Sequence, residues 1–435
     1  MAPPEDPHED TRTLAAISTL LDRVHLMTPG QLPDALMQAA AQLGWSAVLY
    51  LVDYEQRVLV PASAVGVSGR RVQGVDTTLA GRCFRTVEPM PWSTGHGQAR
   101  EQGVWLPVLD GVDRLGVLEV SFPEGTDLDD ALCIQRCRLL AHLAGHLVVA
   151  KGPYGEGLTR IRHRKARSVA SELLWRLLPP LTFGCEGLVV SGLLEPAYDV
   201  AADAFDYSVL DETAHLAIFD ATGHDLNGTV LAAIALAAYR NSRRQGHGLY
   251  DSARTLDEHI GAHGNGERFA TGVLAELDLP SGRLRYLNAG HEPPLLMREG
   301  KVVKELRSGH RIMFGLGEGE ASVGEEWLQP GDQVVFYTDG IPEARSPEGD
   351  FYGLERLIDQ LARSAAAGLA APETLRRIVH AVLEHQNGVL QDDATVLIAQ
   401  WASGKEHAAI SSATGSIAAQ QLSPHDEHGH HLPRR

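Results

Sequence analysis

The segment Leu216–His224 (LAIFDATGH) decides the fold of the second half of the chain. Its four apolar residues are followed at once by Asp220 and then by the turn-forming Gly223. A short apolar run bounded by turn signals indicates a buried β-strand. The strand therefore ends on a carboxylate, which predicts a negatively charged position at the edge of a sheet.

Other aspartates stand beside predicted strands in the same way. They are Asp203 and Asp206 in VAADAFD (200–206), Asp339 after VVFY (334–337), and Asp392 and Asp393 before ATVL (394–397). Taken singly, each aspartate is explained as a turn residue or a helix cap. Gathered at one place, their charges would repel one another and be costly to bury. Hard divalent cations with oxygen ligands relieve that repulsion, so the set favours a metal site.

The order and wording of these segments resemble the stage II sporulation protein E family of bacterial phosphatases, a branch of the protein phosphatase 2C (PPM) superfamily. The resemblance covers about residues 183–402. The matching motifs are Glu195-Pro196-Ala197, Val200–Asp206, Asp220–Asp225, Ala270-Thr271, Asn288–Pro293, Tyr337–Gly340, Glu343–Arg345 and Asp392–Thr395. The resemblance implies a PPM-type α-β-β-α sandwich and a protein-serine/threonine phosphatase that uses two metal ions, Mn²⁺ or Mg²⁺.

The resemblance also implies roles for individual residues. Asp220 should bridge both metal ions and serve catalysis. Asp203 and the carbonyl of Ala221 should complete one metal site, and Asp339 and Asp392 should hold the other.

The motifs also suggest roles for three further residues. His224 is either a general acid that protonates the leaving oxygen or a structural turn residue. Asn288 and His291 are expected to be structural and to hold the loop between core elements.

Two departures from the family pattern bear on activity. Ala201-Ala202 stands where the family has Gly-Gly, and Asp225 stands where it has a third Gly. Alanine is strained where φ must be positive, and Asp225 adds a charge beside the carboxylates. All proposed carboxylate ligands remain, so an active enzyme is favoured. The alternative is a catalytically weak or inactive phosphatase-fold module that binds a regulator.

Residues 30–150 show a helix, strands, helix order that predicts a small α+β domain. The segments Val75–Cys83, Trp105–Val108 and Leu115–Leu118 resemble a GAF sensor domain. The resemblance implies an unknown small molecule or protein as its partner, or dimerisation alone. Four of its side chains, those of Trp45, Tyr50, Cys83 and Trp92, could either line a pocket or pack in the core.

The predicted organisation has five parts and an overall α+β class. They are an N-terminal tail and helix (1–29), the GAF-like sensor domain (30–150), a connecting helix (151–182), the phosphatase domain (183–402) and a disordered His-rich tail (403–435). We expect the connecting helix to run unbroken from Leu158 to Leu178. Its apolar end should dock on the catalytic domain or on a second copy in a homodimer.

Composition limits the partners and the cellular compartment expected for the protein. The 435 residues carry a formal net charge of −18, which disfavours nucleic acid and anionic membranes as main partners. The four cysteines form no CxxC pair and fit a reducing compartment. No secretory signal or membrane-spanning run is evident, so a cytoplasmic location is expected. The expected substrate is a phosphoprotein, such as a phosphorylated anti-sigma factor antagonist.

Overall fold

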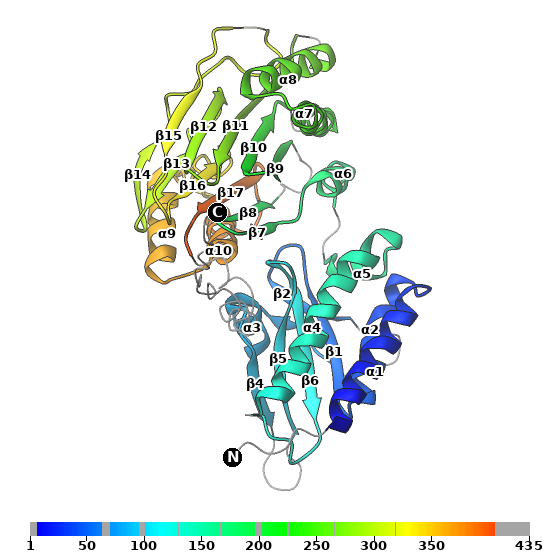
Figure 1. Ribbon diagram of the computed structural model, residues 1–435. Coiled ribbons are helices and arrows are strands. Elements are labelled where there is room, and N and C mark those ends of the chain that lie inside the picture. The colour runs from blue at the N-terminus through cyan, green and yellow to red at the C-terminus, as the bar shows by residue number, and fades with distance from the viewer. Residues whose placement is uncertain are drawn as a thin grey trace, which may run out of the picture.

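The computed structural model describes residues 7–62, 70–94, 101–128, 130–164, 167–195, 202–223, 226–264, 266–317 and 319–404. Within these residues the strands form three antiparallel sheets, one in the N-terminal part of the chain and two in the C-terminal part (Figure 1). Among the described residues, no helix is both long and apolar enough to cross a membrane.

The N-terminal domain is one six-stranded sheet with helices on both faces. Its strand order is β3-β2-β1-β6-β5-β4. The strands are β1 (Ser46–Val52), β2 (Val58–Ala62), β3 (Gln73–Gly74), β4 (Met90–Thr94), β5 (Glu101–Asp110) and β6 (Asp113–Phe122). The helices are α1 (Pro7–Val24), α2 (Leu32–Gln42), α3 (Leu79–Thr86) and α4 (Ala131–Lys151), with the 3₁₀ turns η1 (Pro29–Gln31) and η2 (Gly152–Tyr154).

Alternation along β1 explains why this sheet is covered on both sides. Leu49 and Leu51 pack with α2 and α4 in one core cluster, whereas Tyr50 and Val52 pack with α3 in another. Successive side chains of a strand point to opposite faces, so a run of consecutive apolar residues requires cover on each. The predicted α+β architecture of this region is confirmed, and its GAF type stays a prediction.

The connection between the domains is not the single helix expected over Leu158–Leu178, so that prediction is wrong. Two short helices form instead, α5 (Gly157–Arg162) and α6 (Val169–Leu177). Ser168 has an extended backbone, and its hydroxyl accepts a bond from the Ser171 amide at 3.0 Å, which starts a new helix. The apolar end of α6 does dock on the C-terminal domain, because Leu174 is fully buried in that domain's core.

The C-terminal domain stacks two sheets between two helical layers (Figure 1). One sheet has the order β15-β12-β11-β10-β9, and the other β14-β13-β16-β17-β8-β7. The strands are β7 (Thr182–Cys185), β8 (Leu188–Glu195), β9 (Asp203–Leu210), β10 (Thr213–Ala221), β11 (Ala270–Asp278), β12 (Arg283–Ala289), β13 (Leu295–Arg298), β14 (Lys301–Glu305), β15 (Gly324–Trp327), β16 (Gln333–Tyr337) and β17 (Ala394–Trp401).

Helices cover the outer face of each sheet. α7 (Leu226–Arg244) and α8 (Leu249–Gly264) lie on the five-stranded sheet, and α9 (Leu354–Ala366) and α10 (Ala371–His385) on the six-stranded one (Figure 1). Val334 and Phe336 of β16 face the other sheet, whereas Val335 and Tyr337 face α9 and α10. The α-β-β-α sandwich expected from the sequence is therefore confirmed.

Candidate active site

Asp203 and Asp220 face each other across neighbouring strands. Asp203 begins β9, Asp220 lies one residue before the end of β10, and the antiparallel register pairs them directly. Like charges directly opposite in a sheet are destabilising. Two carboxylates placed opposite each other do not stabilise the fold. Their pairing at the edge of the core therefore indicates a functional site.

Asp203 is buried and is held by two threonines, Thr338 directly after β16 and Thr395 in β17. Its Oδ2 accepts bonds from Thr338 Oγ1 and Thr395 Oγ1, each at 2.7 Å. The Thr395 amide donates in turn to Thr338 Oγ1 at 3.1 Å. Burial, followed by the charges of Asp220 and Asp393, raises the pKa of Asp203 well above its ordinary value, and the two threonine bonds oppose that shift.

Asp393 fixes the backbone that carries Asp203. Its Oδ2 accepts bonds from the amides of Ala202 at 2.7 Å and Asp203 at 3.3 Å. The carbonyl of Ala202 accepts a bond from the Ala221 amide at 3.2 Å. Ala202 is thus tied on both sides and buried, so an alanine is accommodated here in place of the family's glycine. Ala201 lies outside the described residues.

Asp220 stands among several other aspartates. Burial, followed by the charges of Asp339, Asp392 and Asp393, raises the pKa of Asp220 to about 7. Burial also raises the pKa of Asp339. These carboxylates come from the ends of β10 and β16 and the start of β17, which meet at one edge of the sandwich.

Close packing brings the two acid-bearing turns of the second sheet together. A Cβ added at Gly340 would lie 1.9 Å from the Asp393 carbonyl oxygen. Only glycine allows that approach, which accounts for the glycine that follows Asp339. The turn is also braced by the Glu343 amide, which donates to the Asp339 carbonyl at 2.8 Å.

The donor chemistry of this cluster fits divalent metal ions. Carboxylate oxygens are the ligands that Mg²⁺ and Mn²⁺ prefer, and bound cations would relieve the repulsion around Asp220. As placed, no three His, Cys, Asp or Glu side chains of the described residues lie close enough together to hold one ion. The ligand assignment therefore stays a prediction.

Asp206 belongs to the same motif as Asp203 but does not join the cluster. Its carboxylate pairs with Arg240 at 2.7 Å and Arg243 at 2.8 Å, both on α7. Side chains alternate between the two faces of a strand, so Asp206, three positions after Asp203, points to the opposite face. Asp206 therefore anchors α7 to β9 and has a structural role.

Two motif residues are structural, as expected. Asn288 Nδ2 donates to the His291 carbonyl at 2.8 Å, and the His291 amide donates to Asn288 Oδ1 at 2.7 Å. These bonds close the loop after β12. Burial lowers the pKa of His291 to about 4, so its ring is neutral at physiological pH.

His224 and Asp225 lie outside the described residues, so the choice between general acid and turn residue for His224 remains open. The segment that leads to them is anchored. The Thr222 hydroxyl accepts a bond from the Phe269 amide at 3.0 Å and donates to the Phe269 carbonyl at 2.9 Å.

Sequence reasoning gave no role to Thr338 and Thr395, and it placed Asp393 among the strand-end aspartates without its backbone bonds to Ala202 and Asp203. Thr338 precedes Asp339, and Thr395 lies three positions after Asp392, so both stand in short polar runs near proposed metal ligands. Their partner Asp203 lies 135 or more positions away in the chain.

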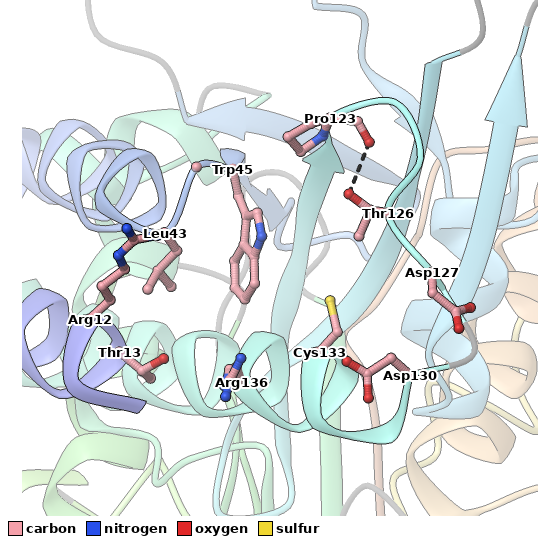
Figure 2. Close-up of a pocket in the computed structure, with 11 residues that line it drawn as sticks. Arg12, Thr13, Leu43, Trp45, Pro123, Thr126, Asp127, Asp130, Cys133 and Arg136 are labelled. Carbon is pink, nitrogen blue, oxygen red and sulfur yellow. Dashed lines mark hydrogen bonds between the residues drawn. The ribbon is translucent and has the colours of Figure 1, made fainter. Parts of the chain in front are cut away.

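The N-terminal domain holds a separate cavity of about 380 Å³ between α1, the α2–β1 connection, the β6–α4 loop and α4. Trp45 projects toward α4 between Leu43 and Cys133, with Arg12 and Arg136 on the lining (Figure 2). Of the four side chains considered as pocket residues, Trp45 lines this cavity. The other three, Tyr50, Cys83 and Trp92, pack in or against the α3 core.

Comparisons with known proteins identify a matching family and several relatives. Residues 211–402 match the family described as Stage II sporulation protein E (SpoIIE). Protein IcfG of Synechocystis is 24% identical over 56% of this chain and 42% of its own length. Phosphoserine phosphatase RsbU of Bacillus subtilis is 21% identical over 49% of this chain and 63% of its own. The chain thus spans less than two thirds of these relatives.

A solved structure, the RsbU and RsbW domains of Rv1364c from Mycobacterium tuberculosis, is 25% identical to this chain. The match covers 50% of this chain and 62% of that one, with a TM-score of 0.44.

Proposed function

We propose that the SpoIIE-type domain of this chain is a metal-dependent phosphatase that removes phosphate from serine or threonine side chains of a protein. The related RsbU of Bacillus subtilis is named a phosphoserine phosphatase, which supports phosphoserine as the substrate group. The match over residues 211–402 includes Asp220, Asp339 and Asp392.

The observation that carries the proposal is the cross-strand pair of Asp203 and Asp220 in a cluster of aspartates. Asp220 would contribute to both ion sites, Asp203 and the carbonyl of Ala221 would help to hold one ion, and Asp339 and Asp392 would help to hold the other. Two Mn²⁺ or Mg²⁺ ions would supply Lewis acidity toward water and toward the phosphate oxygens.

The protein's own residues supply orientation. The hydroxyls of Thr338 and Thr395 both donate to Oδ2 of Asp203. These two bonds fix the orientation of the carboxylate and therefore the direction of its other oxygen. Asp393 holds the backbone of the same residue. Groups fixed in this way need little reorganisation when the phosphate binds, which is where preorganised sites gain rate. His224, as general acid, would donate a proton to the leaving serine or threonine oxygen.

The N-terminal domain would regulate this activity, and the substrate would be a phosphorylated regulator such as an anti-sigma factor antagonist. Direct contacts between the domains support regulation. Arg376 of α10 pairs with Asp76 at 2.6 Å, and His380 Nε2 lies 2.9 Å from the Glu55 carbonyl oxygen.

Hydrolysis by the full chain tests the proposal. Phosphoserine peptide and p-nitrophenyl phosphate should be hydrolysed with Mn²⁺ or Mg²⁺ and not with EDTA. Asp220→Asn should lower the rate by orders of magnitude because it removes the bridging carboxylate. Asp251→Asn, at an exposed position on α8, is the matched control and should leave the rate unchanged.

Two outcomes would count against the proposal. Near-normal hydrolysis by folded Asp220→Asn would contradict the assignment of this residue. Absence of hydrolysis by the wild-type chain with either metal ion, together with phosphopeptide binding, would instead favour the binding module that the Ala201-Ala202 and Asp225 departures suggested.

A further inference from the structure

The threonine of the Ala270-Thr271 motif stands in line with two of the clustered aspartates. Thr271 of β11 lies directly opposite Asp220 of β10, and Asp220 lies directly opposite Asp203 of β9. Residues paired across neighbouring strands point to the same face of a sheet. Two carboxylates and one hydroxyl therefore form a row across three strands.

This row faces the second sheet and is open at the edge of the sandwich. Asp203 accepts a hydrogen bond from Thr395 of β17, so the row points toward that strand. Thr271 and Asp220 are both partly exposed, whereas Ala270 and Ala221 beside them are buried. Solvent water can therefore reach the hydroxyl of Thr271 and the carboxylate of Asp220.

His291 holds the hydroxyl of Thr271. Thr271 Oγ1 lies 2.8 Å from His291 Nδ1. The backbone of His291 is fixed in turn by its two hydrogen bonds with the Asn288 side chain. The histidine is 9% exposed, and burial lowers its pKa to about 4, so the ring is neutral at physiological pH. A neutral imidazole has one nitrogen that donates and one that accepts.

The second polar neighbour of the ring indicates which nitrogen carries the proton. The Tyr337 backbone opposes the lowering of the pKa of His291, as a carbonyl oxygen facing a ring N–H does. Among the described residues Nε2 completes no hydrogen bond of normal geometry. A proton on Nε2 leaves Nδ1 as the acceptor, so the Thr271 hydroxyl donates to Nδ1.

This direction of the hydrogen bond limits what Thr271 can bind. A hydroxyl that gives its one proton to His291 has only lone pairs left for the space beside Asp220. The oxygens of a phosphate dianion and of an ionised carboxylate are acceptors as well, so they do not suit the Thr271 oxygen. A water molecule has two protons to donate, and it does suit this oxygen.

The backbone around Thr271 is held in place. Ala270 and Phe314 exchange two amide-to-carbonyl hydrogen bonds, at 3.0 Å and 2.9 Å, and the Thr222 amide donates to the Phe269 carbonyl at 2.9 Å. A group that is fixed before the reaction needs little reorganisation in the transition state.

We propose that Thr271 accepts a hydrogen bond from the water molecule that attacks the phosphate, and that His291 is a positioning residue that orients the Thr271 hydroxyl. The role toward water rests on the proposed phosphatase function. The hydrogen bond between Thr271 and His291 does not depend on hydrolysis and is tested separately.

Kinetics of the full chain test the role of the hydroxyl. Thr271→Val removes the hydroxyl and keeps the shape of the side chain. With Mn²⁺ and a phosphoserine peptide, kcat should fall about ten- to hundredfold and KM should change less than about twofold, because the water loses its orientation while substrate binding is kept. Thr271→Ser should recover most of the rate. Thr213→Val, at the opposite end of the same sheet and also partly exposed, is the matched control and should leave kcat unchanged.

Two variants of His291 test the positioning role. His291→Asn keeps an acceptor oxygen near the position of Nδ1, whereas His291→Leu has no acceptor there. The Leu variant should lose about tenfold in kcat, and the Asn variant should keep most of it. Thermal melts show whether each variant folds. Mn²⁺ should stabilise Thr271→Val as much as the wild type, because Thr271 is not a proposed metal ligand.

Nitrogen NMR of the full chain with isotope-labelled histidine tests the hydrogen bond itself. The signals that disappear in His291→Asn identify His291. Its Nδ1 should have the chemical shift of a nitrogen without a proton, and this signal should move in Thr271→Val but not in Thr213→Val.

The outcomes separate this proposal from the proposed function. Unchanged kcat in Thr271→Val, or a Thr271→Ser variant as slow as Thr271→Val, would overturn the role of Thr271 and leave the phosphatase intact. A proton on His291 Nδ1 would also overturn it, because the hydroxyl would then be free to donate toward the site. If Thr271→Val does not fold, equal rates of the Asn and Leu variants of His291 would overturn it. Absence of hydrolysis by the wild-type chain would reject the phosphatase and, with it, the role of Thr271 toward water.

Discussion

Arg376 and Asp76 join the two domains through two parallel hydrogen bonds, at 2.6 Å and 3.0 Å, between residues 300 positions apart. Arg376 is 1% exposed and also binds both oxygens of Glu373. The pairing with Arg376 lowers the pKa of Asp76. Bidentate arginine–carboxylate pairs are geometrically specific, so this contact fixes α10 against the N-terminal domain.

Arg376→Met should destabilise the protein by about 3–5 kcal/mol, because it leaves Glu373 buried with less compensating charge. Asp76→Asn should cost less, about 1 kcal/mol, because Asp76 is half exposed. Urea denaturation of the full chain measures both. Arg363→Met, in an exposed pair with Asp359, is the control and should cost under about 0.5 kcal/mol. Equal effects of the two Arg→Met changes would show that the interface contact is dispensable.

Asp220→Asn should stabilise the protein in EDTA while it abolishes hydrolysis. Removing the charge relieves the burial of a carboxylate and its repulsion by neighbouring aspartates, which together raise the pKa of Asp220, and we expect a gain of about 1–3 kcal/mol at pH 8. Added Mn²⁺ should stabilise the wild-type chain and not this variant. Thermal melts of both proteins in EDTA and in Mn²⁺ test this prediction. A variant less stable than the wild type in EDTA would contradict the predicted stabilisation.

Thr395→Val should lower the hydrolysis rate and cost about 1.5–3 kcal/mol, because a carboxylate loses a hydrogen bond. Thr229→Val is a matched control. Thr229 is fully buried and its hydroxyl has no partner among the described residues, so its removal should be neutral or stabilising. Chemical denaturation and a peptide-hydrolysis assay compare the two. A Thr395→Val protein with unchanged rate would remove this threonine from the site.

The pH dependence of stability should contain a contribution from His215 on β10. Burial, followed by the charge of Arg243, lowers the pKa of His215 to about 4. A depressed pKa means that its stabilising contribution is present above the ordinary value of 6.5 and is lost as pH falls toward 4. Replacing it by Gln should remove roughly 1–3 kcal/mol of acid sensitivity across that window. Urea midpoints from pH 4 to 8 measure this, and parallel pH profiles of both proteins would refute it.

Two residues inserted after Glu172, within α6, should rotate the rest of the helix by about 200° and expel Leu174 from the core. We expect a loss of about 2–5 kcal/mol. The same insertion after His163 should cost less than about 1 kcal/mol, because the helix has already ended there. Melting of both proteins distinguishes the cases, and equal losses would mean that α6 responds to the connection as a whole.

The continuous connecting helix was mispredicted for a physical reason. Arg162 and Arg167 both stack on Tyr54, at 4.5 Å and 4.2 Å from its ring centre. Positions five apart lie about 140° apart around a helix, so one unbroken helix could not direct both arginines to that ring. The spacing of apolar residues indicated only a local preference for helix. The stacking of the arginines on Tyr54 and the cap at Ser168 break the helix into two.

The positions of the acids were predictable because each follows or precedes a buried apolar run. The separate role of Asp206 could also have been read from strand alternation. What the sequence could not indicate is which distant donors each acid meets. The bonds from Thr338 and Thr395 to Asp203 and the interdomain pair of Asp76 depend on three-dimensional register alone.

The position of β17 has a consequence for biosynthesis. This strand, Ala394–Trp401, lies between β16 and β8 in the middle of its sheet. On the ribosome the N-terminal domain can fold as soon as it emerges, because domains generally fold as units in order of synthesis. The C-terminal sandwich must wait, with β8 unpaired on that side, until its last strand is translated. Asp392 and Asp393 arrive with that strand, so the nascent chain carries a folded N-terminal domain before its acidic cluster exists.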